Sequence, residues 1–258
     1  MRDRSAKLFL RARNLFFYRN FEKATVENES DAYDGQFLAE SMPTLLPAAK
    51  RYVIVYAQTE AMMTCKDAFV ASLRSPGRIV LQEAIPADTR DLRPLLLNVR
   101  RASPDAVLIA AFLPETGLFL RLAREQDFRV AFIGISTSYD PKLFEVAGRA
   151  ADGLLFSAPF FDPSQQDPGI RSFVSAYTSA YGKLPDVWAA YGYDVVLIAL
   201  QAIGSDIRPL NRALLSMAPF DGVTGRTVFN KDGSVTKALR MLRADASTQS
   251  FKSASTNQ

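Results

Sequence analysis

Two kinds of hydrophobic pattern alternate along the middle of the chain. Short unbroken apolar runs are typical of strands buried on both faces, whereas apolar residues that recur every three or four positions are typical of amphipathic helices. The runs predict strands at 52–56, 78–82, 105–112, 130–134 and 153–157. The spaced patterns predict helices over 60–73, 92–99, 116–126 and 141–147, between those strands. Strands that alternate with helices predict an α/β fold built on a parallel, doubly wound sheet.

The pattern differs on either side of this region. Before it, the apolar run 15–18 predicts a short strand, and Ser30 predicts the start of a helix whose positive end explains Asp31 and Asp34. After it, the polar tail from residue 247 is expected to be disordered. The other later elements expected are helices at 168–181, 186–203 and 210–217, and strands near 227–229 and 237–242 around the turn sequence Asn230–Gly233.

Composition and charge exclude several classes of protein. The 258 residues are 48% hydrophobic and 22% charged, which is ordinary for a globular chain and sufficient for one large domain or two small lobes. The formal net charge of +4 comes from the first 23 residues, which contain seven Lys and Arg but only two acidic residues. Apolar side chains interrupt this basic segment, so we expect neither a secretory signal, nor a membrane span, nor a nucleic-acid partner.

The sequence offers little material for catalysis. It contains no histidine and a single cysteine, Cys65, which excludes Ser/His and Cys/His nucleophiles, imidazole metal sites and an intrachain disulfide. Phosphate-loop motifs are absent, and Gly134–Ser138 differs from a nucleophile elbow in its last residue. The loop 162–167 carries two aspartates and two glutamines, which we interpret as a helix cap in solvent rather than a cation site. Tyr177, Tyr181, Trp188, Tyr191 and Tyr193 have helical spacing and are interpreted as core residues rather than an aromatic box. We therefore expect no enzyme, no metal and no cofactor.

A series of short motifs, each weak alone, resembles a known family in order and spacing. They are Thr89-Arg90-Asp91-Leu92-Arg93-Pro94-Leu95, Pro104-Asp105-Ala106-Val107, Ala151-Asp152-Gly153, Ala190-Tyr191-Gly192-Tyr193-Asp194 and Gly222-Val223-Thr224-Gly225. Together they resemble the periplasmic branched-chain amino-acid (leucine, isoleucine and valine) binding proteins, which have the type I periplasmic binding fold and serve ABC importers. The resemblance covers roughly residues 15–245.

The resemblance implies two α/β lobes, joined by a three-stranded hinge, that close around a small solute. It implies a first lobe formed by 1–49 and 159–240, and a second lobe formed by 50–158 and 241–258. Members of the family have several strand–helix units before the segment that 15–18 matches. The first lobe is therefore expected to be incomplete and the chain N-terminally truncated, with exposed apolar surface and marginal stability.

In this family the solute meets the carboxyl ends of the parallel strands, as is general for open α/β sheets. The positions implied here are Gln58, Glu60, Ala61, Phe112, Ser136 and Thr137. Relatives often carry a tyrosine at Ala61 and at Phe112, and amino-acid binders commonly carry an acid at Ser136. Loss of that acid removes a charge-assisted hydrogen bond of about 1.5–3 kcal/mol. We therefore expect an aromatic acid or an amide to bind better than an α-amino acid.

The function that the resemblance implies is the solute-binding component of an ABC-type importer for amino acids or related small organic solutes. A permease is then the expected protein partner, and the periplasm the expected location, although the chain shows no export signal. An alternative is a ligand-sensing domain of a cytoplasmic regulator with the same fold, but no helix-turn-helix precedes the lobes. A doubly wound enzyme with unrecognised motifs is a third interpretation, which the missing histidine and phosphate loop disfavour.

Overall fold

The computed structural model describes residues 26–85, 91–203, 210–231, 233 and 235–254. Backbone contacts divide the chain into two compact units. We call the part formed by Ser30–Ala158 and Leu239–Gln258 the sheet unit, and the part formed by Met1–Glu29 and Pro159–Ala238 the helical unit. Each unit is described by itself below.

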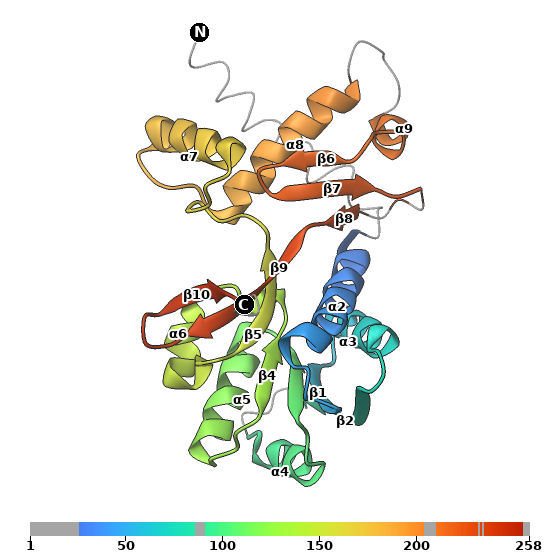
Figure 1. Cartoon of the computed structure of the whole chain (residues 1–258), viewed down its shortest axis with the longest axis vertical. Helices are drawn as coiled ribbons and strands as arrows, with labels where there is room; N and C mark the ends of the chain where they lie inside the picture. The colour runs from blue at the N-terminus through green and yellow to red at the C-terminus, as the bar shows by residue number, and fades with distance from the viewer. Residues whose placement is uncertain (1–25, 86–90, 204–209, 232, 234, 255–258) are drawn as a thin grey trace. The chain divides into compact units, whose positions relative to one another are not determined.

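The sheet unit contains a seven-stranded sheet with the order β10-β9-β5-β4-β3-β1-β2 (Figure 1). Its strands are β1 Arg51–Ala57, β2 Arg78–Ile85, β3 Ala106–Ala110, β4 Ala131–Gly134, β5 Leu155–Pro159, β9 Leu239–Asp245 and β10 Ser250–Ser253. The pairs β1–β2, β1–β3, β3–β4 and β4–β5 are parallel, and β9–β10 is antiparallel. The structure thus confirms the predicted α/β fold with a mostly parallel sheet.

The helices of this unit are α2 Val26–Leu45, which belongs to it from Ser30 on, α3 Glu60–Ser72, α4 Arg93–Arg101, α5 Leu113–Glu125 and α6 Lys142–Ala147. The order of the strands reverses direction at β1, between β2 and β3. Because parallel crossovers are right-handed, this reversal puts α3 on one face of the sheet and α4 and α5 on the other. Local signals set the helix starts: the Thr59 hydroxyl accepts a hydrogen bond from the amide of Met62, 3.4 Å away, and Pro114 lies in the first turn of α5.

The core of the sheet unit is formed by the unbroken apolar runs. The side chains of Ile54 in β1 and Leu108 in β3 are fully buried, as a strand covered on both faces requires. Helices α2 and α3 pack side by side (Figure 1), so closely that a Cβ at Gly35 would lie 2.0 Å from the carbonyl oxygen of Cys65. Only glycine fits at this position without moving α2 away from α3.

Two features of the sheet unit differ from the sequence-based expectation. Helix α2 begins at Val26 rather than Ser30. Its residues Leu38 and Met42 are fully buried in the core of the sheet unit, so residues 30–49 pack with this unit, whereas the expected division assigned 1–49 to the other lobe. Residues 30–49 belong to the sheet unit because the apolar face of α2 packs against α3.

The C-terminal segment from 247 to 254 is ordered, which corrects the expectation of disorder there. It forms a turn and strand β10, and the ring of Phe251 packs against Tyr139, Phe144 and Phe156 at centroid distances of 5.5, 5.1 and 5.2 Å. The polar composition favours disorder, but antiparallel pairing of β10 with β9 and the packing of Phe251 among three other rings hold this segment in place.

The helical unit is formed by α7 Pro168–Tyr181, α8 Val187–Ile203, α9 Leu210–Leu215 and a three-stranded antiparallel sheet. The strands are β6 Phe220–Gly222, β7 Gly225–Phe229 and β8 Val235–Lys237. The strand expected near 237–242 is therefore the end of β8 followed by β9, and these belong to different sheets. The strand expected at 15–18 lies outside the described residues.

Aromatic packing in the helical unit agrees in part with the core interpretation. The ring of Phe173 lies 5.9 Å from Phe161, 5.8 Å from Tyr177 and 4.7 Å from Tyr193, measured between centroids. Trp188, however, is 75% exposed. In the described part of the chain, no helix is both long and apolar enough to cross a membrane.

Candidate functional site

The six sequence-predicted site residues all lie in segments that directly follow parallel strands of the sheet unit. Gln58 follows β1, and Glu60 and Ala61 form the first turn of α3; Phe112 follows β3; Ser136 and Thr137 follow β4. Because β1, β3 and β4 are parallel neighbours, their carboxyl ends share one edge of the sheet. We call these loops, residues 58–61, 112 and 136–137, the carboxyl-end loops.

The strand order makes this edge a natural place for a ligand. The sheet reverses direction between β1 and β3, so the loops after these strands lead to helices on opposite faces. Such a reversal leaves a crevice outside the carboxyl ends of the strands, and open α/β sheets bind their ligands there. Gln58 and Phe112 follow the two strands that flank the reversal.

The loops after β3 and β4 are joined directly. The hydroxyl of Thr137 donates a hydrogen bond to the carbonyl oxygen of Ala111, 2.9 Å away. Ala111 is the residue before Phe112, which is 43% exposed. Thr137 therefore has a structural partner, and its bond holds the segment that presents the Phe112 ring to solvent.

Sequence reasoning missed a buried acid beneath the loop after β4. Asp34 in α2 is 5% exposed, and its carboxylate accepts hydrogen bonds from the amide of Ser136, 3.0 Å away, and from the hydroxyl of Ser157 in β5. Burial raises the pKa of this carboxyl above its ordinary value, although the hydrogen bonds from Ser157 and Ser136 oppose that shift.

The macrodipole explanation for Asp34 is wrong, because α2 begins at Val26 and the dipole acts only on the first turn. The signal that could have identified Asp34 is its position on the apolar face of the helix. It lies beside Gly35 and four residues before Leu38, which is fully buried.

The electrostatics of the carboxyl-end loops favour a negative group on the solute. Helices α3 and α5 both begin at this edge, and the first amides of a helix have no partner within it. At Ser136 the side chain is neutral and half-buried, and the acid nearest to its backbone, Asp34, is already engaged by two donors. Glu60, which is exposed, is the acidic side chain among the six predicted residues.

Among the described residues, no three acidic, histidine or cysteine side chains lie together as a group that could hold a metal ion. The carboxylates in the loop 162–167 serve local structure. Asp162 accepts from the amide of Ser164 at 2.9 Å, and Asp167 accepts from the amide of Ile170 at 3.0 Å, at the start of α7. Both bonds agree with the interpretation of this loop as a helix cap.

The sequence pattern of a protein family described as periplasmic binding protein matches residues 35–249. The chain belongs to this family. Members bind solutes and are not enzymes, and the relatives confirm the predicted resemblance to branched-chain amino-acid binding proteins. The match includes all six predicted site residues and most of both units.

One relative is the leucine-, isoleucine-, valine-, threonine- and alanine-binding protein of Pseudomonas aeruginosa. It is 22% identical over 222 residues, which are 83% of this chain and 57% of that protein. The chain thus spans little more than half the length of this relative.

Two solved structures are similar in fold. One, from Rhodospirillum rubrum and provisionally described as a branched-chain amino acid ABC transporter, has a TM-score of 0.76 and 27% identity, over 86% of this chain and 65% of that one. The other is an ABC transporter solute-binding protein from R. palustris in complex with benzoate. Its TM-score is 0.63 at 19% identity, over 83% of this chain and 60% of that one.

Proposed function

We propose that the chain acts as the solute-binding component of an ABC-type importer for small organic solutes, with the solute held at the carboxyl-end loops. The observation that carries the proposal is the family match over 35–249, together with the position of all six predicted residues after parallel strands at one edge of the sheet. The Gln58 side chain and the exposed Phe112 ring would contact the solute. The amides at the starts of α3 and α5 would receive its negative group.

We further propose an aromatic acid or an amide as the preferred solute, rather than an α-amino acid. An exposed aromatic ring at Phe112 suits a flat apolar ligand, and a neutral Ser136 gives no counter-charge to an ammonium group. The benzoate held by the R. palustris protein supports this choice. The name of the P. aeruginosa relative favours amino acids, and Glu60 is the side chain here that could pair with an ammonium group.

Isothermal titration of the purified chain with benzoate, benzamide, leucine and isoleucine tests both proposals. We expect benzoate or benzamide to bind more tightly than either amino acid, and Phe112→Ala to weaken that binding by roughly two- to tenfold, since an aromatic pair contributes about 0.5–1.5 kcal/mol. The matched control is Leu97→Ala, which removes an exposed apolar side chain from α4 and is expected to change nothing.

The outcomes separate the two levels of the proposal. Tight leucine binding without benzoate or benzamide binding would overturn the proposed preference for an aromatic acid or amide. It would still support the proposed function as a solute-binding protein. Absence of heat with all four compounds, from a chain whose circular dichroism shows folded structure, would contradict solute binding at this site.

The proposal includes a permease partner and a periplasmic location, because its relatives belong to ABC transporters. Osmotic-shock fractionation of cells that express the gene from its natural locus tests the location. Recovery of the protein in the shock fluid supports export, and recovery only with the spheroplasts contradicts it.

A further inference from the structure

A second recess lies in the sheet unit, away from the carboxyl-end loops. It has a volume of about 880 Å³, and its charged lining residues are Arg124, Arg149, Asp152, Arg243, Asp245 and Lys252. We call it the basic recess. Arg124 is in the last turn of α5, before β4, and Asp152 precedes β5. The basic recess is therefore at the edge where the parallel strands begin, opposite to the candidate solute site.

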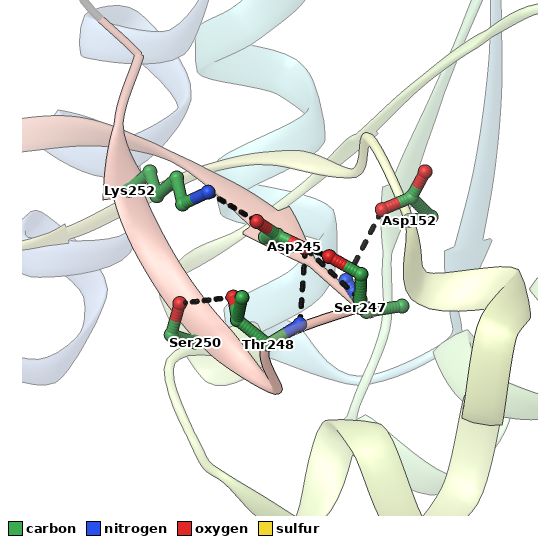
Figure 2. Close-up of polar contacts among 7 residues, drawn as sticks. Asp152, Asp245, Ser247, Thr248, Ser250 and Lys252 are labelled. Atoms are coloured by element: carbon green, nitrogen blue, oxygen red, sulfur yellow. Dashed lines mark hydrogen bonds and ion pairs between the residues drawn. The ribbon is translucent and has the colours of Figure 1, made fainter.

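The two acids of the basic recess are engaged by the turn between β9 and β10 (Figure 2). Asp152 accepts a hydrogen bond from the amide of Ala246 at 3.1 Å. Asp245 accepts from the amides of Ser247 and Thr248, at 2.9 and 3.2 Å, and pairs with Lys252. The Lys252 ammonium group and the Ser247 hydroxyl hold the pKa of Asp245 well below its usual range. These bonds shape the turn, and Lys252 balances the charge of Asp245. The three arginines then outnumber the remaining carboxylate, that of Asp152.

The three arginines have no such partners. Within the described part of the chain, no carboxylate forms an ion pair with the guanidinium of Arg124, Arg149 or Arg243, and none of the three donates a side-chain hydrogen bond. They come from three separate segments: the end of α5, the 3₁₀ turn Gly148–Ala151, and β9. Like charges gathered around one recess repel one another, and a bound anion relieves that repulsion.

The chemistry of these side chains defines the anion. A guanidinium group is planar, always charged, and presents a fork of N–H donors that matches two oxygens of a phosphate. Three guanidinium groups around one recess favour an anion with several negative charges over an anion with one. The volume is within the roughly 300–1,000 Å³ typical of small-molecule sites, which is more than a single inorganic phosphate needs.

We propose that the basic recess binds a phosphate compound with several negative charges, held by Arg124, Arg149 and Arg243. The site is separate from the proposed solute site, since the two lie at opposite edges of the sheet. Neither the family match nor the resemblance assigns it.

Titration calorimetry with pyrophosphate on the full chain tests the proposal. We expect saturable binding that weakens as sodium chloride is raised, and a loss of roughly tenfold or more in affinity for Arg149→Gln and for Arg243→Gln, since each charge-assisted bond contributes about 1.5–3 kcal/mol. The matched control is Arg78→Gln, which removes the same charge from an exposed arginine in β2, at the other end of the strand order. This control is expected to bind pyrophosphate as the unaltered chain does.

Three results would overturn the proposal. Absence of binding at millimolar pyrophosphate and low salt is the first, and an equal loss for Arg78→Gln, which would indicate a general attraction to positive charge, is the second. The third comes from a vesicle arm. Binding to phosphatidylglycerol but not phosphatidylcholine vesicles, lost in the same variants and without any pyrophosphate binding, would mean that the arginines meet a lipid surface and not a soluble phosphate compound.

Discussion

The carboxylate of Asp34 accepts a hydrogen bond from the backbone amide of Ser136, which lies 102 positions later in the sequence. The same carboxylate accepts a bond from the hydroxyl of Ser157, so one side chain of α2 connects the loop after β4 with β5. Ser136 is one of the proposed solute residues. The position of that loop therefore depends on a buried acid that does not itself meet the solvent.

Replacing this acid tests how strongly it holds the loop. Asp34→Ala leaves the Ser136 amide and the buried Ser157 hydroxyl without their acceptor, and we expect a loss of about 2–4 kcal/mol in the free energy of unfolding. Asp34→Asn keeps one acceptor oxygen and can donate to Ser157, so its loss is expected to be less than half as large. Urea denaturation measures both, and equal losses in the two variants would contradict the role assigned to the hydrogen bonds.

The raised pKa of Asp34 predicts a pH dependence of known sign. A carboxyl whose pKa is higher in the folded chain binds more protons when folded, so its contribution to stability is fully present below its ordinary pKa. That contribution is lost as the pH rises through the raised pKa. Asp34 also has titratable neighbours, since the charges of Asp34 and Asp31 both act on the buried thiol of Cys65.

Asp34→Asn removes this titration. We therefore expect the destabilisation caused by Asp34→Asn to be largest at low pH and to decrease as the pH rises toward neutrality. Urea denaturation at several pH values measures it. A difference between the two chains that is constant with pH would show that Asp34 has an ordinary pKa.

In the helical unit, Lys237 predicts a rise in stability at alkaline pH. Its ammonium group donates to the hydroxyl of Thr227 and lies 4.0 Å from the buried carboxylate of Asp194, yet burial lowers the pKa of Lys237 to about 8. The folded chain then binds fewer protons than the unfolded chain between about pH 8 and the ordinary lysine pKa of 10.5, so stability increases across that interval.

Thermal melts between pH 8 and 10 test this through the difference between the unaltered chain and Lys237→Met, because the raised pKa values of Cys65 and Tyr191 act in the opposite direction in both chains. Lys237→Met is expected to remove the rise. A melting temperature that falls with pH to the same extent in both chains would contradict the shift. Lys231→Met, in the turn between β7 and β8, serves as the control for loss of a lysine charge.

The ordering of the C-terminal segment rests on Phe251. We expect Phe251→Ala to lower the free energy of unfolding by about 2–3 kcal/mol, somewhat less than for a fully buried phenylalanine, because the ring is half-buried. We also expect faster hydrogen exchange of the β10 amides. Phe251→Leu, which keeps most of the apolar volume, is the matched control, and unchanged exchange in Phe251→Ala would contradict the role of the ring.

The helical unit presents apolar side chains to solvent along α8. Leu200 is 64% exposed and Tyr193, seven positions earlier on the same side of the helix, is 37% exposed. Exposed apolar surface of this kind promotes association. We expect Leu200→Gln to reduce the concentration-dependent light scattering of the chain, while Leu97→Gln on α4 leaves it unchanged. Equal scattering in the unaltered chain and both variants would exclude association through α8.

The positions of the elements could be predicted because hydrophobic periodicity is a local property. The runs around Ile54 and Leu108 identify strands covered on both faces, and the structure places β1 and β3 there. Element boundaries are predicted less accurately: the apolar run that ends at Phe112 predicts a strand throughout, whereas β3 ends at Ala110 and Phe112 precedes α5. Pro114, which suits a first helical turn, decides the difference.

The sequence by itself thus determined the alternation of strands and helices and the parallel sheet, since each follows from neighbouring residues and from the handedness of crossovers. Tertiary structure alone decided the rest. Asp34 has its role because two serines more than a hundred positions away supply its donors, Phe251 is ordered because three other rings surround it, and the basic recess exists because three distant segments each contribute an arginine. Partners so far apart in the chain leave no periodic signal, and only folding brings them together.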